Sequence, residues 1–373
     1  MNHISRVGPG YSRDTIIRRI DKTGRITDLS EKRTVSQKFF FAFEGITEYD
    51  YFEGIRRNFV MLNRHGKSVD LQLIKRDFCI KDMSGAEDNL QMIRDYTHAL
   101  LHPDQVAPGI ALARMLTDVY EMTKKKEFGY LHDTEEWKKY QVLHGLFLKI
   151  LDKVKNSDCF DGRRFISDVD EFEGLVVDEL RKNGVPDAVF KRVHFPSYKK
   201  GYNPETDRLC LVIDRDFSNA KNVEWTPQNN KWYRELIRKC QTDSDDEEMR
   251  HVRLFVSNPC FEMWLILHFD ESLKFSKDMK DTLWFNKKGG EEGNMKPSFH
   301  IISQLILDHY GDTYTKDEID FDKWFKDRVQ NAVRNVVEGN YCTEVKKLND
   351  NIGSNLGALL KDLIPLEGLS GSP

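Results

Sequence analysis

Residues Lys38–Glu44 have the sequence KFFFAFE, a short continuous apolar run that ends in a carboxylate. A run of this length without polar alternation is typical of a strand that is buried on both faces, as in a parallel sheet. Gly45 follows the strand, and Thr47 stands where it can cap a helix beginning at Glu48. We therefore predict a buried strand, a tight turn and a helix, in that order.

Three further segments predict strands of the same sheet. They are residues 69–75 (VDLQLIK), 209–213 (LCLVI) and 252–256 (VRLFV). Apolar residues recur every four positions over 51–59, so a helix with one apolar face lies between the first two strands. This order predicts an α/β fold with a mostly parallel sheet flanked by helices. In such sheets, sites form at the carboxyl ends of the strands.

The pattern changes between residues 101 and 205. Apolar residues there recur every three or four positions, namely Trp137, Tyr140, Leu143, Phe147, Ile150 and Val154, with an earlier helix indicated by Ala113, Leu116 and Tyr120. This spacing favours a mainly helical insertion. We expect a basic N-terminal arm (1–37), an α/β domain in two halves (38–100 and 206–270) around the insertion (101–205), and a polar C-terminal region (271–373) with helices near 298–309, 322–338 and 353–364.

Bulk composition excludes some classes of protein. The chain has 373 residues, of which 39% are hydrophobic and 32% charged, with a formal net charge of −4. This charge argues against a general coating of nucleic acid and leaves local basic patches open. Its six cysteines form no C-x-x-C pair, which argues against a zinc site. We find neither a signal-like start nor an apolar run long enough for a bilayer, so we expect a cytoplasmic protein that does not enter a membrane.

Carboxylates stand at the ends of two predicted strands. Glu44 ends the first, Asp214 and Asp216 follow the third, and Glu48 lies one helical turn after Glu44. Mg²⁺ and Mn²⁺ prefer oxygen ligands, and cations are needed to neutralise such a cluster of like charges. The pattern predicts a divalent-metal site in which Glu44 and Asp214 face each other across neighbouring strand ends. A helix-capping or solvated carboxylate is the alternative for each residue taken alone.

Other suggestive groups have simpler interpretations. His98 and His102 are four residues apart on a predicted helix, but they lack the Glu of a zinc-binding H-E-x-x-H motif, so we interpret them as surface or partly buried histidines. The acidic run Asp245–Glu248 is interpreted as a solvated loop. Gly66-Lys67-Ser68 matches only the end of a phosphate-binding loop, so any ATP hydrolysis requires a partner.

Three motifs together resemble the RloB-like family of Toprim proteins. They are FEGITEYDYF (43–52), LVIDRD (211–216) and SNPCFEMWLILHF (257–269). The resemblance extends over roughly 38–100 and 205–270, and more loosely over the tail near 351–364. Family members are typically shorter, so the insertion is a departure whose role the resemblance does not explain.

The resemblance implies a Toprim fold, related to topoisomerases, primases and nucleases of the overcoming-lysogenization-defect type. It implies that Glu44, Glu48, Asp214 and Asp216 hold Mg²⁺ or Mn²⁺ for phosphodiester chemistry, and that Glu262 in the third motif is a further ligand or base. It also implies a role in phage defence by abortive infection, usually beside a separate ATPase of the ABC or SMC type.

Two functions follow as hypotheses. The first is a metal-dependent nuclease that cleaves RNA, tRNA included, or DNA, with Glu44, Asp214, Asp216 and Glu262 as catalytic residues. The alternative is a non-catalytic regulatory or sensor subunit that docks the partner ATPase. The insertion 101–205 is our candidate for docking or target recognition. The sequence leaves the oligomeric state open, a homo-oligomer included.

Overall fold

The structure is a computed structural model of the chain. It describes residues 17–20, 26–29, 37–59, 69–74, 86–123, 141–160, 164–190, 194–196, 202–203, 205–215, 231–286, 295–316 and 318–364.

A five-stranded sheet forms the centre of the molecule. Its strands lie in the order β4 (Val69–Ile74), β3 (Gln37–Phe43), β5 (Arg208–Asp214), β6 (Val252–Asn258) and β7 (Gly353–Ser354). The first four strands are parallel to their neighbours, and the short β7 pairs antiparallel with β6. The predicted α/β fold with a mostly parallel sheet is therefore confirmed.

Both faces of the sheet are buried, as the unbroken apolar run of β3 predicts. Phe39, Phe41 and Phe43 contribute to one hydrophobic cluster, whereas Phe40 contributes to another on the opposite face. Strand β5 divides its side chains in the same way, because successive residues of a strand point to opposite faces. The molecule therefore has three layers, with the sheet in the middle.

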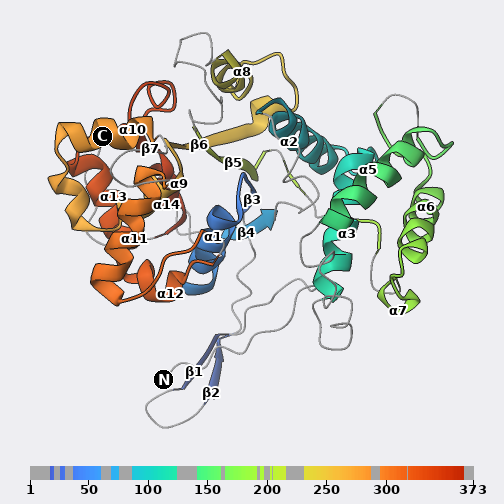
Figure 1. The fold of residues 1–373 in the computed structure, drawn as a ribbon, viewed down its shortest axis with the longest axis horizontal. Coiled ribbons are helices and arrows are strands. Elements are labelled where there is room, and N and C mark those ends of the chain that lie inside the picture. Colours follow the sequence, from blue (N-terminus) through green and yellow to red (C-terminus); the bar gives the residue numbers. More distant parts are fainter. Residues whose placement is uncertain are drawn as a thin grey trace.

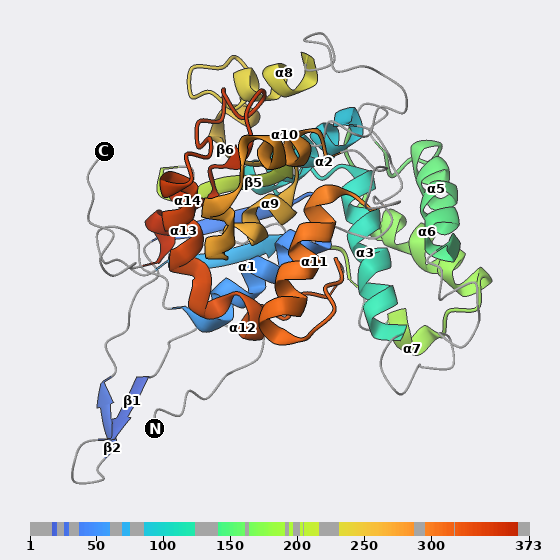
Figure 2. The same ribbon diagram turned by 60° about the vertical axis from the view of Figure 1, so that its left-hand side comes forward.

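The first helical layer combines α1 with the C-terminal region (Figures 1 and 2). Its α-helices are α1 (Ile46–Asn58), α9 (Phe261–Ile266), α10 (Lys277–Phe285), α11 (Pro297–Tyr310), α12 (Phe321–Trp324), α13 (Val329–Glu338) and α14 (Leu356–Leu363), joined by the 3-10 turns Asp270–Lys274 and Lys326–Arg328. Helices α1 and α12 approach closely at Gly54, where a Cβ atom would lie 2.2 Å from the Phe321 ring. The C-terminal region thus completes the core of the α/β domain.

The second layer contains α2, α8 and the helices of the predicted insertion (Figure 1). It comprises α2 (Ala86–Leu101), α3 (Pro108–Thr123), α5 (Gln141–Lys155), α6 (Val169–Lys182), α7 (Asp187–Phe190) and α8 (Lys231–Lys239), with a 3-10 turn at Met249–His251. Ala113, Leu116 and Tyr120 of α3 and Phe147 of α5 are buried, as their spacing predicts. They belong to one cluster with the adjacent face of the sheet.

Several local expectations need correction. Thr47 does not cap α1, which begins at Ile46 with Gly45 as its N-cap and no side-chain capping bond. The sequence predicts a helix over 353–364, but its first two residues form strand β7 because they pair with the end of β6. Helix α14 begins after them. The predicted basic arm contains an antiparallel pair, β1 (Ile17–Ile20) and β2 (Ile26–Leu29).

The acidic run is not a fully solvated loop. Asp246 pairs with Arg94 at 3.1 Å, and Glu248 pairs with both Arg94 and Arg164. His98, predicted to be a surface or partly buried histidine, is partly buried and contacts Glu248 at 2.8 Å. These ion pairs connect α2, the 164–168 segment and the loop before β6, because opposite charges that are distant in sequence meet at the same surface.

Some sequence expectations lie outside the described residues. These are Asp216, Trp137, Tyr140 and the segment Gly66–Ser68. In the part of the chain that the structure describes, we find no helix with the length and apolar character required to span a bilayer.

Candidate functional site

Glu44 and Asp214 meet at the carboxyl ends of β3 and β5. The Glu44 backbone N–H donates to Val212 O at 3.1 Å, which continues the pairing of the two strands. The Asp214 backbone N–H in turn donates to Glu44 Oε2 at 2.9 Å. The predicted approach of these two residues across neighbouring strand ends is therefore confirmed. The bond also orients the Glu44 carboxylate, because a charged acceptor strengthens it.

Glu48 enters the same region from the first turn of α1. Gly45 leaves room for it, since a Cβ atom at that position would lie 2.6 Å from Glu48 Oε2. The residue is only 4% exposed. Burial, together with the negative charges of Glu44 and Glu262, raises the pKa of Glu48 from its ordinary value of 4.5 to about 8. The carboxyl group of Glu48 therefore holds a proton at neutral pH in the metal-free protein.

Glu262 lies in the helix that follows strand β6, the neighbour of β5 in the sheet. Strand β6 ends at Asn258, a cis peptide bond joins Asn258 to Pro259, and Cys260 is the N-cap of α9. Glu262 lies in the first turn of this helix and is 2% exposed. Its Oε1 atom forms an ion pair with Lys316, whereas its Oε2 atom is buried and has no hydrogen-bond partner among the described residues.

Lys316 and Tyr314 complete the surroundings of these acids, and sequence reasoning missed both. They follow α11, far from the three motifs, in a loop that crosses the start of α1. Thr47 Oγ1 donates to the Lys316 carbonyl at 2.5 Å, which fixes the loop there. Tyr314 is buried, and its raised pKa reflects burial followed by the nearby charges of Glu262, Cys260, Glu48 and Asp214. No local sequence signal could have placed this loop.

Cys260 lies among these acids, and its thiol is protonated at neutral pH in the metal-free protein. Burial, and then the charges of Glu262 and Asp214, raise the pKa of its thiol well above the ordinary value. The thiol contacts Ser298 Oγ at 3.1 Å. Since the thiolate is the form that binds metals, Cys260 serves as packing in this state.

Buried, hydrogen-bonded residues lie next to the acids in the chain. Tyr51, one turn after Glu48 on α1, contacts His268 Nε2 through its hydroxyl at 3.0 Å, and His268 Nδ1 contacts the Trp264 carbonyl at 3.1 Å. Burial lowers the pKa of His268 to about 3, so the imidazole is neutral. Arg215, next to Asp214, is buried and donates to Asn349 Oδ1 at 2.9 and 3.1 Å.

The acidic side chains at this site are of the chemical type that binds hard divalent cations. Glu44, Glu48, Asp214 and Glu262 offer carboxylate oxygens, and the buried Oε2 of Glu262 lacks a hydrogen bond within the described part of the chain. Their arrangement is less complete, because no group of three or more His, Cys, Asp or Glu side chains in the described ranges is placed to hold an ion. A cation would draw the carboxylates together by removing their repulsion.

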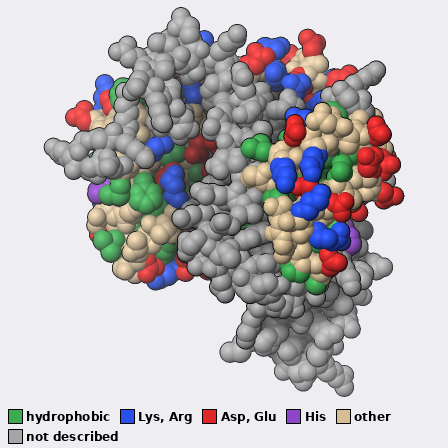
Figure 3. All heavy atoms as spheres, turned by 45° about the vertical axis from the view of Figure 1, so that its right-hand side comes forward, with side chains coloured by type: hydrophobic (Ala, Val, Ile, Leu, Met, Phe, Trp, Pro, Cys, Tyr) green, Lys and Arg blue, Asp and Glu red, His purple; other side chains and the backbone are tan. Residues whose placement is uncertain are grey.

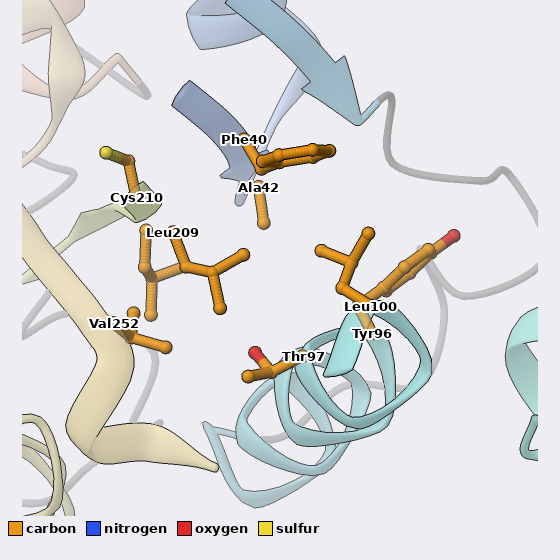
Figure 4. Close-up of a pocket in the computed structure, with 9 residues that line it drawn as sticks. Phe40, Ala42, Tyr96, Thr97, Leu100, Leu209, Cys210 and Val252 are labelled. Atoms are coloured by element: carbon orange, nitrogen blue, oxygen red, sulfur yellow. The ribbon is translucent and has the colours of Figure 1, made fainter. Parts of the chain in front are cut away.

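A small cavity lies elsewhere, between the sheet and α2 (Figure 4). Phe40, Ala42 and Leu209 line it from the strands, and Tyr96 and Leu100 line it from the helix. The described residues that line it are mainly apolar and include no carboxylate. The acidic strand ends, rather than this cavity, are therefore the candidate site.

The chain matches the model of the protein family described as RloB-like protein over residues 39–363. The match includes β3, β5 and β6, the helical insertion and the loop with Lys316. No curated protein and no solved structure matches the chain significantly.

Proposed function

Because the chain belongs to the RloB-like family, we propose that it is a divalent-metal-dependent nuclease of the Toprim type. The observation that carries the proposal is the hydrogen bond that joins Glu44 and Asp214 at the carboxyl ends of two adjacent parallel strands, with Glu48 and Glu262 buried nearby. In the proposed role the protein cleaves phosphodiester bonds in RNA, tRNA included, or in DNA. It acts in the cytoplasm as the effector of an anti-phage abortive-infection system under the control of a partner ATPase.

The residues have separate tasks in this proposal. Glu44, Glu48, Asp214 and Asp216 would hold Mg²⁺ or Mn²⁺, which when bound supplies an activated water and stabilises the leaving oxygen. The Asp214 backbone N–H orients Glu44. Glu262 lies beside them as a further ligand or proton acceptor, and Lys316 brings a positive charge to the same place.

The alternative is a regulatory or sensor subunit that keeps the acidic site but does not cut, and that docks the ATPase. The ion pair between Glu262 and Lys316 favours it, since this pair occupies a carboxylate that the nuclease would use. Cleavage of nucleic acid distinguishes the two proposals.

The test uses purified full-length protein with mixed tRNA and with plasmid DNA, in Mg²⁺, in Mn²⁺ and in excess chelator. Each reaction is run alone and with any ATPase that is encoded beside the gene. We expect metal-dependent cutting by the wild type and none by Glu44→Gln or Asp214→Asn. Metal binding without cutting in any of these mixtures would favour the regulatory alternative.

A further inference from the structure

We propose that Lys316 is an internal counter-ion of the acidic site and competes with a divalent cation for Glu262. The inference deepens the proposed function, because it assumes that a divalent cation is the ligand of this site. It concerns how the site is held in its metal-free state and which contact must break when the cation enters.

The charges at the strand ends require compensation. Glu262 is 2% exposed and pairs with the Lys316 ammonium, whose charge also acts on Glu48. An isolated carboxylate at such a depth is strongly disfavoured, so a paired cation is needed while no metal is bound. Lys316 meets that need from the polypeptide itself.

The loop that carries Lys316 is fixed at several points. Asp312 binds both Lys323 Nζ at 2.6 Å and Trp324 Nε1 at 2.8 Å. Tyr314 packs on Phe299, and Thr47 binds the Lys316 carbonyl. The backbone of Lys316 is thus anchored, while its side chain is 47% exposed. A long, flexible side chain on a fixed backbone can turn outward without unfolding the loop.

A second observation, at Tyr314, points to a ligand beside Glu262. The Tyr314 hydroxyl is buried near the carboxyl groups of Glu262, Glu48 and Asp214, and it has no hydrogen-bond partner among the described residues. Buried polar atoms without partners are rare in folded proteins and mark missing water, ions or ligands. A hydrated cation beside Glu262 would bring water molecules to both orphan oxygens, Tyr314 Oη and Glu262 Oε2.

Exchange of the two cations follows from their charges. A divalent ion interacts with each carboxylate about twice as strongly as an ammonium at equal distance. It can therefore displace Lys316 from Glu262, and the released ammonium is left at the exposed rim of the site. Removing the ammonium should make the empty site more receptive to a divalent ion.

The experiment measures Mn²⁺ binding by calorimetry and melting temperature, without nucleic acid, for the wild type and Lys316→Met. The Met side chain keeps the apolar stem and removes the charge. We expect Lys316→Met to melt at a lower temperature without metal and to bind Mn²⁺ at least about tenfold more tightly. Lys316→Arg keeps the charge and should bind Mn²⁺ no more tightly than the wild type.

Lys323→Ala is the matched control, since Lys323 forms an ion pair at the same loop and is 46% exposed. Its Mn²⁺ affinity should equal that of the wild type. Unchanged or weaker Mn²⁺ binding by Lys316→Met, or equal tightening by Lys323→Ala, overturns the inference. If Lys316→Met does not fold without metal, restoration of cooperative melting by Mn²⁺ supports the competition, and failure to restore it overturns it.

These outcomes are separate from those for the nuclease. Competition for Mn²⁺ without any cleavage would end the nuclease proposal and leave the counter-ion intact. Cleavage by the wild type with no change in Mn²⁺ affinity in Lys316→Met would do the reverse.

Discussion

Glu179 on α6 and Glu48 on α1 are both buried glutamates, but they differ in the charges that surround them. Glu179 forms ion pairs with Lys149 at 2.9 Å, with Lys182 at 3.1 Å and with Lys153. Hydrogen bonds, first from Lys153 and then from Lys149, lower its pKa to about 2. The space-filling view shows Lys and Arg side chains gathered on this helical lobe among acidic ones (Figure 3).

At the strand ends the balance is the opposite. Glu48 has a pKa raised to about 8 by burial and by the charges of Glu44 and Glu262. Lys316 opposes this rise but does not outweigh it. A carboxylate with a surplus of cations is stable as it stands, whereas a group of carboxylates with too few cations destabilises the fold unless a ligand neutralises them. Ionisable groups with strongly shifted pKa values cluster at functional sites. The acids at the strand ends, rather than Glu179, are therefore our candidate site.

The largest expected effect is a loss of activity when a carboxylate at the strand ends is neutralised. Asp214→Asn and Glu44→Gln keep the shape of the side chain but remove a charge that a bound metal needs. We expect metal-dependent cleavage to fall by about 10²-fold to 10³-fold or more. Melting temperature without metal should stay the same or rise, since repulsion is relieved. Severe unfolding of both variants, with no effect of metal on the wild type, would show that these carboxylates are structural.

The free energy of unfolding should depend on pH because of the titration of Glu48. Its pKa is 4.5 ordinarily and about 8 in the folded protein, so the folded state binds the extra proton between these values. The stabilisation is fully present below about pH 4.5 and is lost as pH rises through about 8, a change on the order of a few kcal/mol. Chemical unfolding in chelator at several pH values measures it.

Glu48→Gln is the control for this effect, because the amide cannot titrate. The variant should lose the fall in stability between pH 4.5 and 8 and should be the more stable protein at pH 8. A wild type whose stability is flat over that range, or rises, would contradict the protonated state of Glu48.

Glu179 should behave in the opposite sense. The pKa of Glu179 is lowered to about 2, so its stabilisation is present above its ordinary pKa of 4.5 and is lost as pH falls toward 2. Its lysine partners are about half-exposed, so solvent screens the pairs. We expect Glu179→Gln to lower the free energy of unfolding by about 1–2 kcal/mol at pH 7.

Asp178→Asn provides the comparison for Glu179. Asp178 is the neighbouring residue and pairs with Arg181 at 3.2 Å, but its side chain is 63% exposed. Its loss should change the free energy of unfolding by less than about 0.5 kcal/mol. Equal effects of the two substitutions in urea unfolding at pH 7 would show that burial of Glu179 adds nothing to its ion pairs.

The smallest expected effect concerns the contact between Thr47 and the loop of Lys316. Thr47→Val removes the hydrogen bond to the Lys316 carbonyl and should destabilise the protein by about 1 kcal/mol. Thr315→Val removes a longer, exposed bond to the Glu318 carbonyl at 3.4 Å and should have less effect. Chemical unfolding of the two variants compares them, and a larger loss for Thr315→Val would contradict the anchoring role of Thr47.

The sequence by itself determined the strands and the position of the acids along the chain. The run of phenylalanines before Glu44 indicates a doubly buried strand, and the apolar residues before Asp214 indicate its neighbour. Parallel strands place their carboxyl ends at one edge, so the meeting of Glu44 with Asp214 follows from pattern alone. These are local signals, because strand periodicity is set by residues adjacent in the chain.

Only the tertiary structure decided which charges compensate which. Thr47 and Lys316 are 269 positions apart, and no periodic pattern links them. Thr47 has the sequence signature of a helix cap, but the loop that covers α1 uses its hydroxyl instead. Glu48 and Glu179 likewise look alike as helical glutamates. Their pKa values diverge because desolvation and Coulomb interactions depend on burial and on neighbours in space, which packing of distant segments alone determines.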